Sequence, residues 1–397
     1  MCCLAVALAE VGLMMRSPLI ALYATRLGAS ASLAGGLFTA FALGRMAGQV
    51  PGGVLADRVG DRRVCAAALL ISALGPLGFA LVPRPYALLA FMAFEGVASG
   101  MVSPAFLSLV GRSVPGELRG RAIGVWLAVL LASDAVGPLV GAPAAAVWGG
   151  RLPFLLAAGL SASSAAVLRW GVLSPRPPAP ASRESAAPDA AVANPAGWAL
   201  LAGPGGALLM SVAAISFYGE FIFGMLQAML PLYLCQVLGT GPAAVSLLFT
   251  VNFTILAALQ PLAGYAADRV GGRRLLAVAP WLMVGAVAMM AFSRSYAGVV
   301  AWFCLECVGA AALIPTTRKV LSDYFSPRGQ SGRAFGAFGL LSGLGAVVGP
   351  VATGLLYARW SAGPTFGVVA ALGAVLALAY LAVQTSSARR PPVPEGS

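Results

Sequence analysis

Long apolar segments alternate with short polar connections along the whole chain. Twelve such segments are centred near residues 15, 44, 73, 98, 132, 160, 221, 254, 284, 309, 346 and 374. Apolar runs of about 18 residues or more are typical of helices that cross a membrane. The runs are too long and too uniformly apolar for the strands of a membrane barrel, so the pattern predicts twelve transmembrane α-helices. The first run has no basic flank or cleavage site, and we expect a retained helix rather than a removed signal.

One charged motif occurs twice, each time between two apolar segments. The first copy, GVLADRVGDRR, begins at Gly53, and the second, GYAADRVGGRR, begins at Gly264. The same offset of 211 residues pairs Gly28 with Gly239, Gln49 with Gln260, Glu95 with Glu306 and Pro104 with Pro315. After a slip of one residue, Arg121 pairs with Arg333. Duplicated halves around a central pathway are the architecture of secondary transporters.

The repeat divides the chain into two halves, and the composition between them changes. Residues 1–170 and 205–385 each hold six predicted helices, which we expect to form two bundles related by a pseudo-twofold axis. Residues 171–204 are rich in Pro, Ala and Ser, which is linker composition. Residues 386–397 form a short polar tail. The predicted fold is therefore an all-α membrane protein of two six-helix bundles.

Basic residues lie mainly on one side of this predicted topology. Eighteen Lys and Arg residues fall on the side of the termini and the linker, and five fall on the other. The positive-inside rule then places both termini in the cytoplasm of a cell that carries this multi-pass protein in its cytoplasmic membrane. The net charge of +12 is thus a topology signal rather than a sign of a nucleic-acid partner, with a smaller role in binding anionic lipid headgroups left open.

The chain holds few groups that could support enzymatic chemistry. It has no histidine, no GxxxxGK[ST] loop and no cluster of metal-ligating residues, so we expect no enzyme, no metal and no cofactor. Any proton coupling must use carboxylates. Cys304 and Cys307 have the spacing of a metal or redox pair, but they sit inside an apolar helix, which favours packing.

The repeated motif resembles the G-x-L-A-D-R-x-G-x-R-R signature of the major facilitator superfamily, and the resemblance covers nearly the whole chain. Its two copies comprise Gly53, Asp57, Arg58, Gly60, Arg62 and Arg63, and then Gly264, Asp268, Arg269, Gly271, Arg273 and Arg274. Glycine suits the tight turn, and the aspartate can accept backbone N–H groups or pair with an arginine. The motif is then either a static anchor or, as the resemblance implies, a latch between the halves that opens during alternating access.

A second resemblance lies in the fifth helix. Gly137, Pro138 and Gly141 are similar to the Gly-Pro signature of the superfamily's drug antiporters, although Ser133 stands where the pattern usually has glycine. Small residues let helices approach closely, and proline bends a helix. Packing alone therefore explains these residues as well as a role in export does.

Charged side chains inside the predicted helices are the main candidates for function, because each costs at least about 2.5 kcal/mol at mid-membrane. They are Glu10 and Arg16 in the first helix, Arg45 in the second, Glu95 in the fourth, Asp134 in the fifth, Glu220 in the seventh and Glu306 in the tenth. The resemblance implies that helices one, four, seven and ten line the central cavity, and each of them carries such a charge.

The equivalent residues Glu95 and Glu306 are expected to face each other near mid-depth, where one could hold a proton near neutral pH. The alternative is structural neutralisation by Arg16 or Arg45. Asp134 is expected to pair with an arginine such as Arg45. Weaker candidates are Gln227, which matches Arg16 in the repeat, Asn252, and the aromatic residues Phe94, Phe217, Tyr218, Phe221, Phe223 and Trp302. Met92 stands where many of the superfamily's antiporters carry an arginine.

The sequence thus predicts a monomeric secondary transporter in the lipid bilayer that exports small organic compounds in exchange for protons. Acids outnumber bases in the predicted cavity, which favours cationic or zwitterionic substrates. An anionic substrate held by Arg16 or Arg45 remains open, because a guanidinium binds carboxylate or phosphate well. The alternatives are an uptake symporter or facilitator and, more remotely, a membrane sensor that does not transport.

Overall fold

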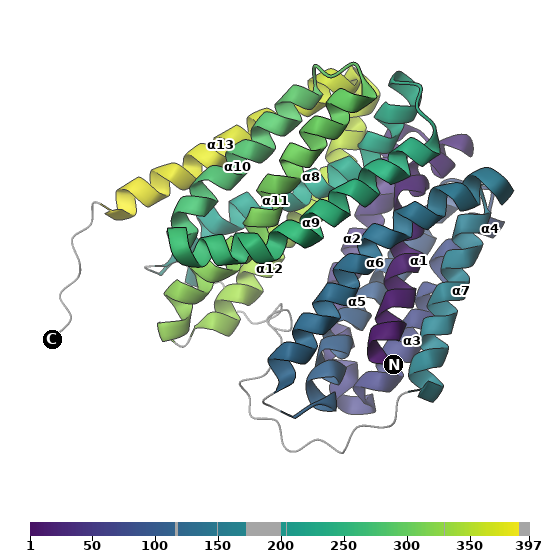
Figure 1. The fold of residues 1–397 in the computed structure, drawn as a ribbon, viewed down its shortest axis with the longest axis horizontal. Helices are drawn as coiled ribbons and strands as arrows, with labels where there is room; N and C mark the ends of the chain where they lie inside the picture. The colour runs from purple at the N-terminus through teal and green to yellow at the C-terminus, as the bar shows by residue number, and fades with distance from the viewer. Residues whose placement is uncertain (116–117, 149, 172–199, 204, 329, 389–397) are drawn as a thin grey trace.

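The computed structural model describes residues 1–115, 118–148, 150–171, 200–203, 205–328 and 330–388, which form helices joined by short connections (Figure 1). The first half contains α1 (Cys2–Arg26), α2 (Ala31–Val59), α3 (Asp61–Ser72), α4 (Leu74–Leu81), α5 (Ala87–Ser113), α6 (Arg119–Trp148) and α7 (Leu152–Ala166), which Val167–Gly171 extends as a π-helix. The second contains α8 (Gly206–Leu232), extended by the π-helix Tyr233–Val237, then α9 (Pro242–Val270), α10 (Gly272–Met290), α11 (Tyr296–Phe325), α12 (Ser331–Trp360) and α13 (Ala362–Ala388).

These helices account for the predicted membrane spans. Within the described residues, eleven spans are long and apolar enough to cross a membrane, and α3 and α4 together make one of them, Asp61–Leu81. The remaining helix, α2, has 29 residues, but Arg45 and its many glycines lower its mean hydropathy. The predicted linker at 171–204 and tail at 386–397 fall largely outside the described residues.

Glycines let the helices inside each half pack backbone to backbone. A Cβ at Gly48 of α2 would collide with the carbonyl of Val97 in α5, and one at Gly100 would collide with the carbonyl of Arg45. This close packing fixes the position of Arg45 along α2. The absence of a side chain is therefore required at these positions.

The Gly-Pro segment of the fifth predicted helix lies in α6, and it packs against α1. Cβ atoms at Gly137 and Gly141 would collide with the backbone at Met14 and Met15, next to Arg16. The second half repeats the arrangement, since Gly349 of α12 packs in the same way against Phe221 of α8. The packing role predicted for these glycines is thus present in the structure, and the first of the two contacts sits beside a buried charge.

The two halves meet at the ends of the helices that lie opposite both chain termini. There, Gly35 of α2 contacts the backbone of Pro350 in α12, and Gly354 contacts Ser32. One helical turn further along, Thr39 Oγ1 donates a hydrogen bond of 2.7 Å to the carbonyl of Val347. We call this contact between α2 and α12 the glycine seam. From it the halves diverge toward the ends that hold the N- and C-termini (Figure 1).

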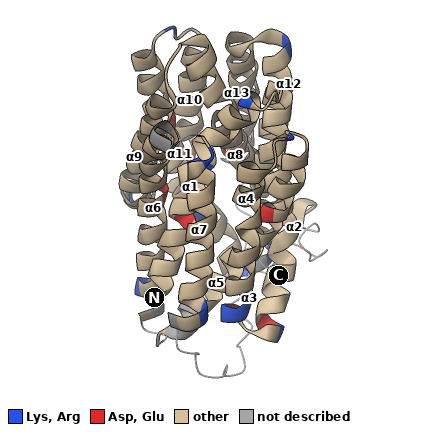
Figure 2. Ribbon diagram, turned by 90° about the vertical axis from the view of Figure 1, so that its right-hand side faces the viewer, with Lys and Arg blue, Asp and Glu red and all other residues tan. Residues whose placement is uncertain are grey.

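Charged residues are sparse along the helices and gather near their ends. Figure 2 shows several Lys and Arg positions close to the N-terminus, with acidic positions part-way along the helices. At the connection between α2 and α3, Gly60 has φ +101°, and at the equivalent connection between α9 and α10, Gly271 has φ +95°. Both values lie in the region that favours glycine, as expected for the tight turn of the repeated motif.

Candidate functional site

Arg16 and Glu95 form a buried ion pair inside the first half. Arg16 of α1 is 1% exposed, Glu95 of α5 is 4% exposed, and Arg16 Nη2 donates to Glu95 Oε1. Gly75 of α4 makes room for the pair, since a Cβ there would collide with the Glu95 carboxylate. Arg16 therefore balances the charge of Glu95, which is the structural neutralisation that we gave as the alternative to a proton-carrying role. Arg16 Nε and Nη1 and Glu95 Oε2 have no hydrogen-bond partner among the described residues.

Glu306 occupies the matching position of the second half in a different environment. This residue of α11 is 5% exposed and borders an enclosed pocket of about 50 Å³. Three phenylalanines line the same pocket, Phe223 of α8, Phe249 of α9 and Phe303 of α11, together with Asn252 of α9. Within the described residues, no basic side chain lies within 4 Å of the Glu306 carboxylate. A pocket of this size holds only one or a few water molecules.

The residue that replaces Arg16 in the second half explains the difference. Gln227 follows Arg16 by 211 positions and accepts a hydrogen bond of 3.1 Å from Ser17 Oγ, so it ties α8 to α1. Likewise, Ala286 stands where the first half has Gly75, so the space for a carboxylate beside the third helix is lost. The structure therefore places Glu95 and Glu306 each among residues of its own half and does not bring them into contact.

The other mid-helix charges gather around Arg45 of α2. Arg45 interacts electrostatically with Glu10 of α1, Asp134 of α6 and Glu220 of α8, and Glu10 interacts with Asp134. Arg45 and Glu220 come from different halves, and both side chains are exposed. We call these four residues the Arg45 cluster. The predicted pairing of Asp134 with Arg45 is thus an electrostatic interaction, and Asp134 Oδ1 has no hydrogen-bond partner among the described residues.

The two copies of the charged motif also differ in their contacts. In the second copy, Lys319 of α11 binds Asp268 at 3.0 Å and Asp323 at 3.5 Å, so this aspartate is paired inside its own half. In the first copy, Arg62 Nη2 donates a hydrogen bond of 2.7 Å to the carbonyl of Arg169, at the end of the extended α7. The guanidinium therefore binds a carbonyl in the last turn of this helix, where positive charge is favourable.

Sequence reasoning missed two contributors to this site. Phe249 and Phe303 line the Glu306 pocket together with Phe223, which was a candidate, whereas Phe94 is 65% exposed. The helical spacing of Asn252 from Phe249 on α9 was the available signal, because residues three apart share a helix face. Cys307 donates a hydrogen bond of 3.2 Å to the carbonyl of Asn252, which agrees with the packing role predicted for the cysteine pair.

A known protein family has a sequence pattern that matches both halves of the chain. The sequence pattern of the Major Facilitator Superfamily matches residues 2–241 and, again, residues 215–397. The chain belongs to the Major Facilitator Superfamily. It is a transporter embedded in a membrane, not an enzyme, and its substrates are small molecules. The duplicated match agrees with the offset of 211 residues that relates the two halves.

A bacterial efflux pump and a bacterial drug-resistance protein are among the relatives of this superfamily member. The multi-drug resistance efflux pump PmrA of Streptococcus pneumoniae is 28% identical over 307 residues, which cover 76% of this chain and 73% of the pump. The quinolone resistance protein NorA of Staphylococcus aureus is 29% identical over 143 residues, which cover 36% of this chain and 37% of the relative.

Solved structures support the fold. A bacterial homolog of the human lysosomal transporter Spinster, in an inward-facing and occupied conformation, superposes with a TM-score of 0.78 at 16% identity, covering 99% of this chain and 97% of the other. The nucleoside transporter NupG also gives a TM-score of 0.78, at 13% identity, covering 96% and 99% of the two chains. At these identities the likeness shows the fold and nothing about the substrate.

Proposed function

We propose that this transporter exports small organic compounds, cationic ones foremost, in exchange for protons. It acts as a monomer in the cytoplasmic membrane with both termini in the cytoplasm. The excess of basic residues on the side of the termini supports this orientation. The likeness to the efflux pump PmrA supports export. The observation that carries the proposal is the unpaired, buried carboxyl group of Glu306.

A buried carboxylate without a counter-charge is costly, so it takes up a proton or binds a cation. These two occupants are the two ligands of an exchanger that moves an organic cation one way and a proton the other. Around Glu306, the aromatic rings of Phe223, Phe249 and Phe303 can bind a small cationic group through their faces, while the apolar body of the compound stays outside this pocket of about 50 Å³. Competition for one carboxylate then couples the two fluxes.

The Arg45 cluster supplies the second part of the mechanism. Glu220 is exposed and can meet a cation before its charged group reaches Glu306. Arg45 and Glu220 belong to different halves and attract each other, so their interaction strengthens or weakens whenever the halves move. Arg16 is occupied by Glu95 and takes no part in binding an anion. In this scheme Glu95 is structural and Glu306 carries the exchanged proton.

The test is proton movement in liposomes that contain the purified protein and a trapped pH-sensitive dye. Under an imposed pH gradient, a panel of cationic, zwitterionic and anionic compounds is added. We expect cations to trigger proton movement opposite to their own, and we expect Glu306→Gln to abolish it. Cys304→Ser, two residues away on the same helix, serves as the control that keeps every charge and full activity.

Three outcomes would contradict the proposal. Proton movement in the same direction as the compound would make the protein an uptake symporter. Flux of a labelled compound without any proton signal would make it a facilitator. Full proton-coupled activity in Glu306→Gln would remove this carboxyl group from the mechanism, whatever the direction of flux.

A further inference from the structure

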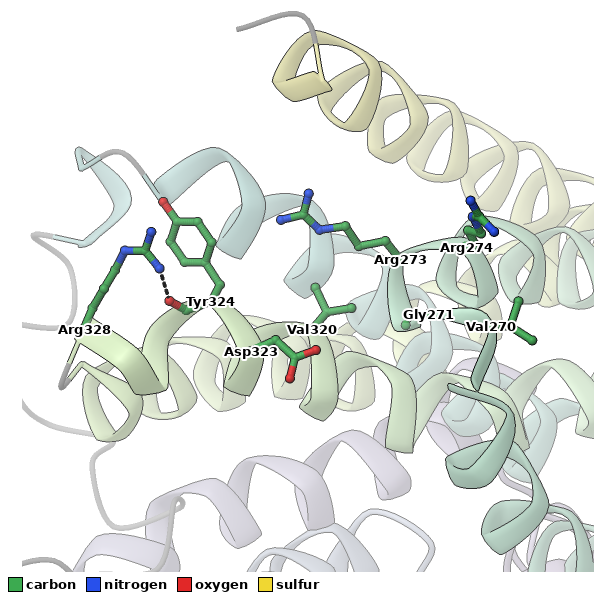
Figure 3. A pocket seen from close by; sticks show the side chains of 9 residues that line it. Val270, Gly271, Arg273, Arg274, Val320, Asp323, Tyr324 and Arg328 are labelled. Atoms are coloured by element: carbon green, nitrogen blue, oxygen red, sulfur yellow. Dashed lines mark hydrogen bonds between the residues drawn. The ribbon is translucent and has the colours of Figure 1, made fainter. Parts of the chain in front are cut away.

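A separate pocket of about 370 Å³ lies at the end of the second half, where α10 begins and α11 ends (Figure 3). The residues that matter for its chemistry are Gly271, Gly272, Arg273, Arg274, Tyr324 and Arg328. The membrane spans of α10 and α11, Gly272–Met290 and Tyr296–Arg328, both terminate here. The pocket therefore opens at the level where lipid headgroups meet water, away from the Glu306 pocket and the Arg45 cluster.

Positive charge is concentrated in this pocket. Three of its lining residues are arginines, and among the described residues none of these guanidinium groups has a carboxylate within 4 Å. The acidic lining residue Asp323 points to the other side of α11 in Figure 3, where it binds Lys319 at 3.5 Å. Arg273 instead extends toward Tyr324 and Arg328. The side that faces Arg273 and Arg328 is thus cationic and unpaired.

The guanidinium of Arg328 is held in place, and the backbone that carries Arg273 is anchored. The Arg328 guanidinium lies over the Tyr324 ring, 4.0 Å from its centroid, and Nη1 donates to the carbonyl of the same tyrosine. The backbone of Arg273 is fixed from α13, because Tyr380 donates a hydrogen bond of 3.4 Å to its carbonyl. Each guanidinium keeps further N–H donors for a ligand, and those of Arg328 are pre-positioned, which lowers the entropy lost on binding.

The start of α10 adds backbone N–H groups to the positive charge of the pocket. α10 begins at Gly272, directly after Gly271 with φ +95°, so the amides of Gly272 and Arg273 have no acceptor inside the helix, whereas those of Arg274 and Leu275 donate to the carbonyl of Gly271. The positive end of the helix dipole points in the same direction as these amides. Gly272 itself is buried, and a Cβ there would lie 3.0 Å from Val320 Cγ2, so the glycine brings the start of α10 close to α11.

The first copy of the motif does not offer the same donors. Arg62, which corresponds to Arg273 by the offset of 211 residues, donates to the carbonyl of Arg169. Arg273 makes no equivalent side-chain contact with a described residue, and its side chain lies in the pocket. The repeat therefore contains one arginine that closes a helix end and one that is available to a ligand.

We propose that this pocket binds the phosphate of an acidic phospholipid headgroup, with Arg273 and Arg328 donating from two sides. Arg binds phosphate through several parallel N–H groups, and the unpaired α10 amides suit the same oxygens. A soluble phosphate ester shares this chemistry, but the ends of the spans at the pocket favour the lipid. The inference concerns a site outside the export pathway and stands without the proposed function.

The test compares lipid retention by the full-length protein in detergent, measured by native mass spectrometry with phosphatidylglycerol and with phosphatidylcholine of the same chains. We expect wild-type protein to prefer phosphatidylglycerol. Since each basic residue near an acidic headgroup contributes about fivefold, the double variant Arg273→Gln/Arg328→Gln should bind it roughly thirtyfold more weakly. The matched control is Arg294→Gln/Arg359→Gln, which removes two arginines at the opposite ends of the helices and should leave the preference unchanged.

Asp323→Asn gives a second test with the opposite expected result. Because the expected result is stronger binding, a variant that failed to fold could not produce it. Removing this acid should strengthen phosphatidylglycerol binding several-fold, because the field at the pocket becomes more positive. Equal lipid preference in wild-type protein and the Arg273→Gln/Arg328→Gln variant would overturn the site. Displacement of the lipid by glycerol phosphate at millimolar concentration would assign the site to soluble phosphate and overturn the lipid as its occupant.

Discussion

Glu95 and Glu306 occupy equivalent positions in the two halves, yet they meet opposite electrostatic environments. Glu95 has an arginine within hydrogen-bonding reach and a glycine that makes room for its carboxylate. Glu306 has neither, and instead borders an enclosed aromatic pocket. Duplication places a functional group twice, but the neighbours of each copy decide whether its charge is neutralised or available. Two single replacements, Arg16 by Gln227 and Gly75 by Ala286, separate the two environments.

The largest expected effect tests the available member of this pair. Glu306→Gln keeps the shape of the side chain and removes its proton, so proton-coupled exchange should fall by about a hundredfold or more. The protein should still insert and elute as a single species in size-exclusion chromatography. Proton movement at the wild-type rate in the liposome assay would show that Glu306 and Glu95 are functionally alike.

The next effect tests the neutralised member. Arg16→Ala leaves the Glu95 carboxylate buried without its partner, and the free energy of unfolding should fall by about 3–5 kcal/mol. Glu95→Gln combined with Arg16→Ala should restore most of this loss, because no unpaired charge remains. Thermal unfolding in detergent measures both. In Gln227→Ala the loss should be smaller, on the order of 1–3 kcal/mol, since a neutral hydrogen bond and some packing disappear but no charge is left unpaired.

A smaller effect concerns the glycine beside Arg16. Gly141→Ala places a methyl group against the Met15 backbone, and separating α1 from α6 should destabilise the protein by about 1–3 kcal/mol. Gly367→Ala is the matched control, because open space surrounds that glycine. Equal melting temperatures for the two variants would mean that α6 does not pack tightly on α1 and that Arg16 is held by other contacts.

The smallest expected effect on stability is that of Asp268→Asn in the second copy of the charged motif, which we compare with Asp57→Asn in the first copy. Asp268 is largely exposed and pairs with Lys319 in its own half, so Asp268→Asn should change the free energy of unfolding by less than about 1 kcal/mol and leave most transport intact. Asp57→Asn should greatly reduce transport if the first copy is the latch between the halves. Initial rates of substrate flux measure the contrast, and equal rates would make both copies anchors.

The sequence was sufficient to predict the helices, the repeat and the mid-helix charges, because these depend on local composition and spacing. It did not predict that the third helix divides into α3 and α4 at Ala73. Pro76 explains the break, since it lacks an N–H and its ring crowds the carbonyl four residues earlier. This signal was present in the chain, but hydropathy does not detect it.

The partners of the charges could not be predicted, because they depend on how each helix is rotated and tilted against its neighbours. Arg16 and Arg45 were equal candidates to neutralise Glu95. The helix of Arg45, α2, packs far more extensively on α5 than α1 does, yet the side chain that reaches Glu95 is Arg16 of α1. The same limit applies to Arg62 and Arg273, which stand at matching positions of the motif and make different contacts. Side-chain direction is a property of the assembled bundle.

The glycine seam has a pharmacological consequence. In this conformation α2 and α12 close one end of the protein backbone against backbone, and from this seam the two halves diverge toward the end that holds the N-terminus (Figure 1). A blocker of the Arg45 cluster must therefore enter from the end of the protein opposite the seam. A compound applied from the opposite side meets the glycine seam. A thin molecule that inserted between Gly35 and Gly354 would keep α2 and α12 apart without competing with the substrate.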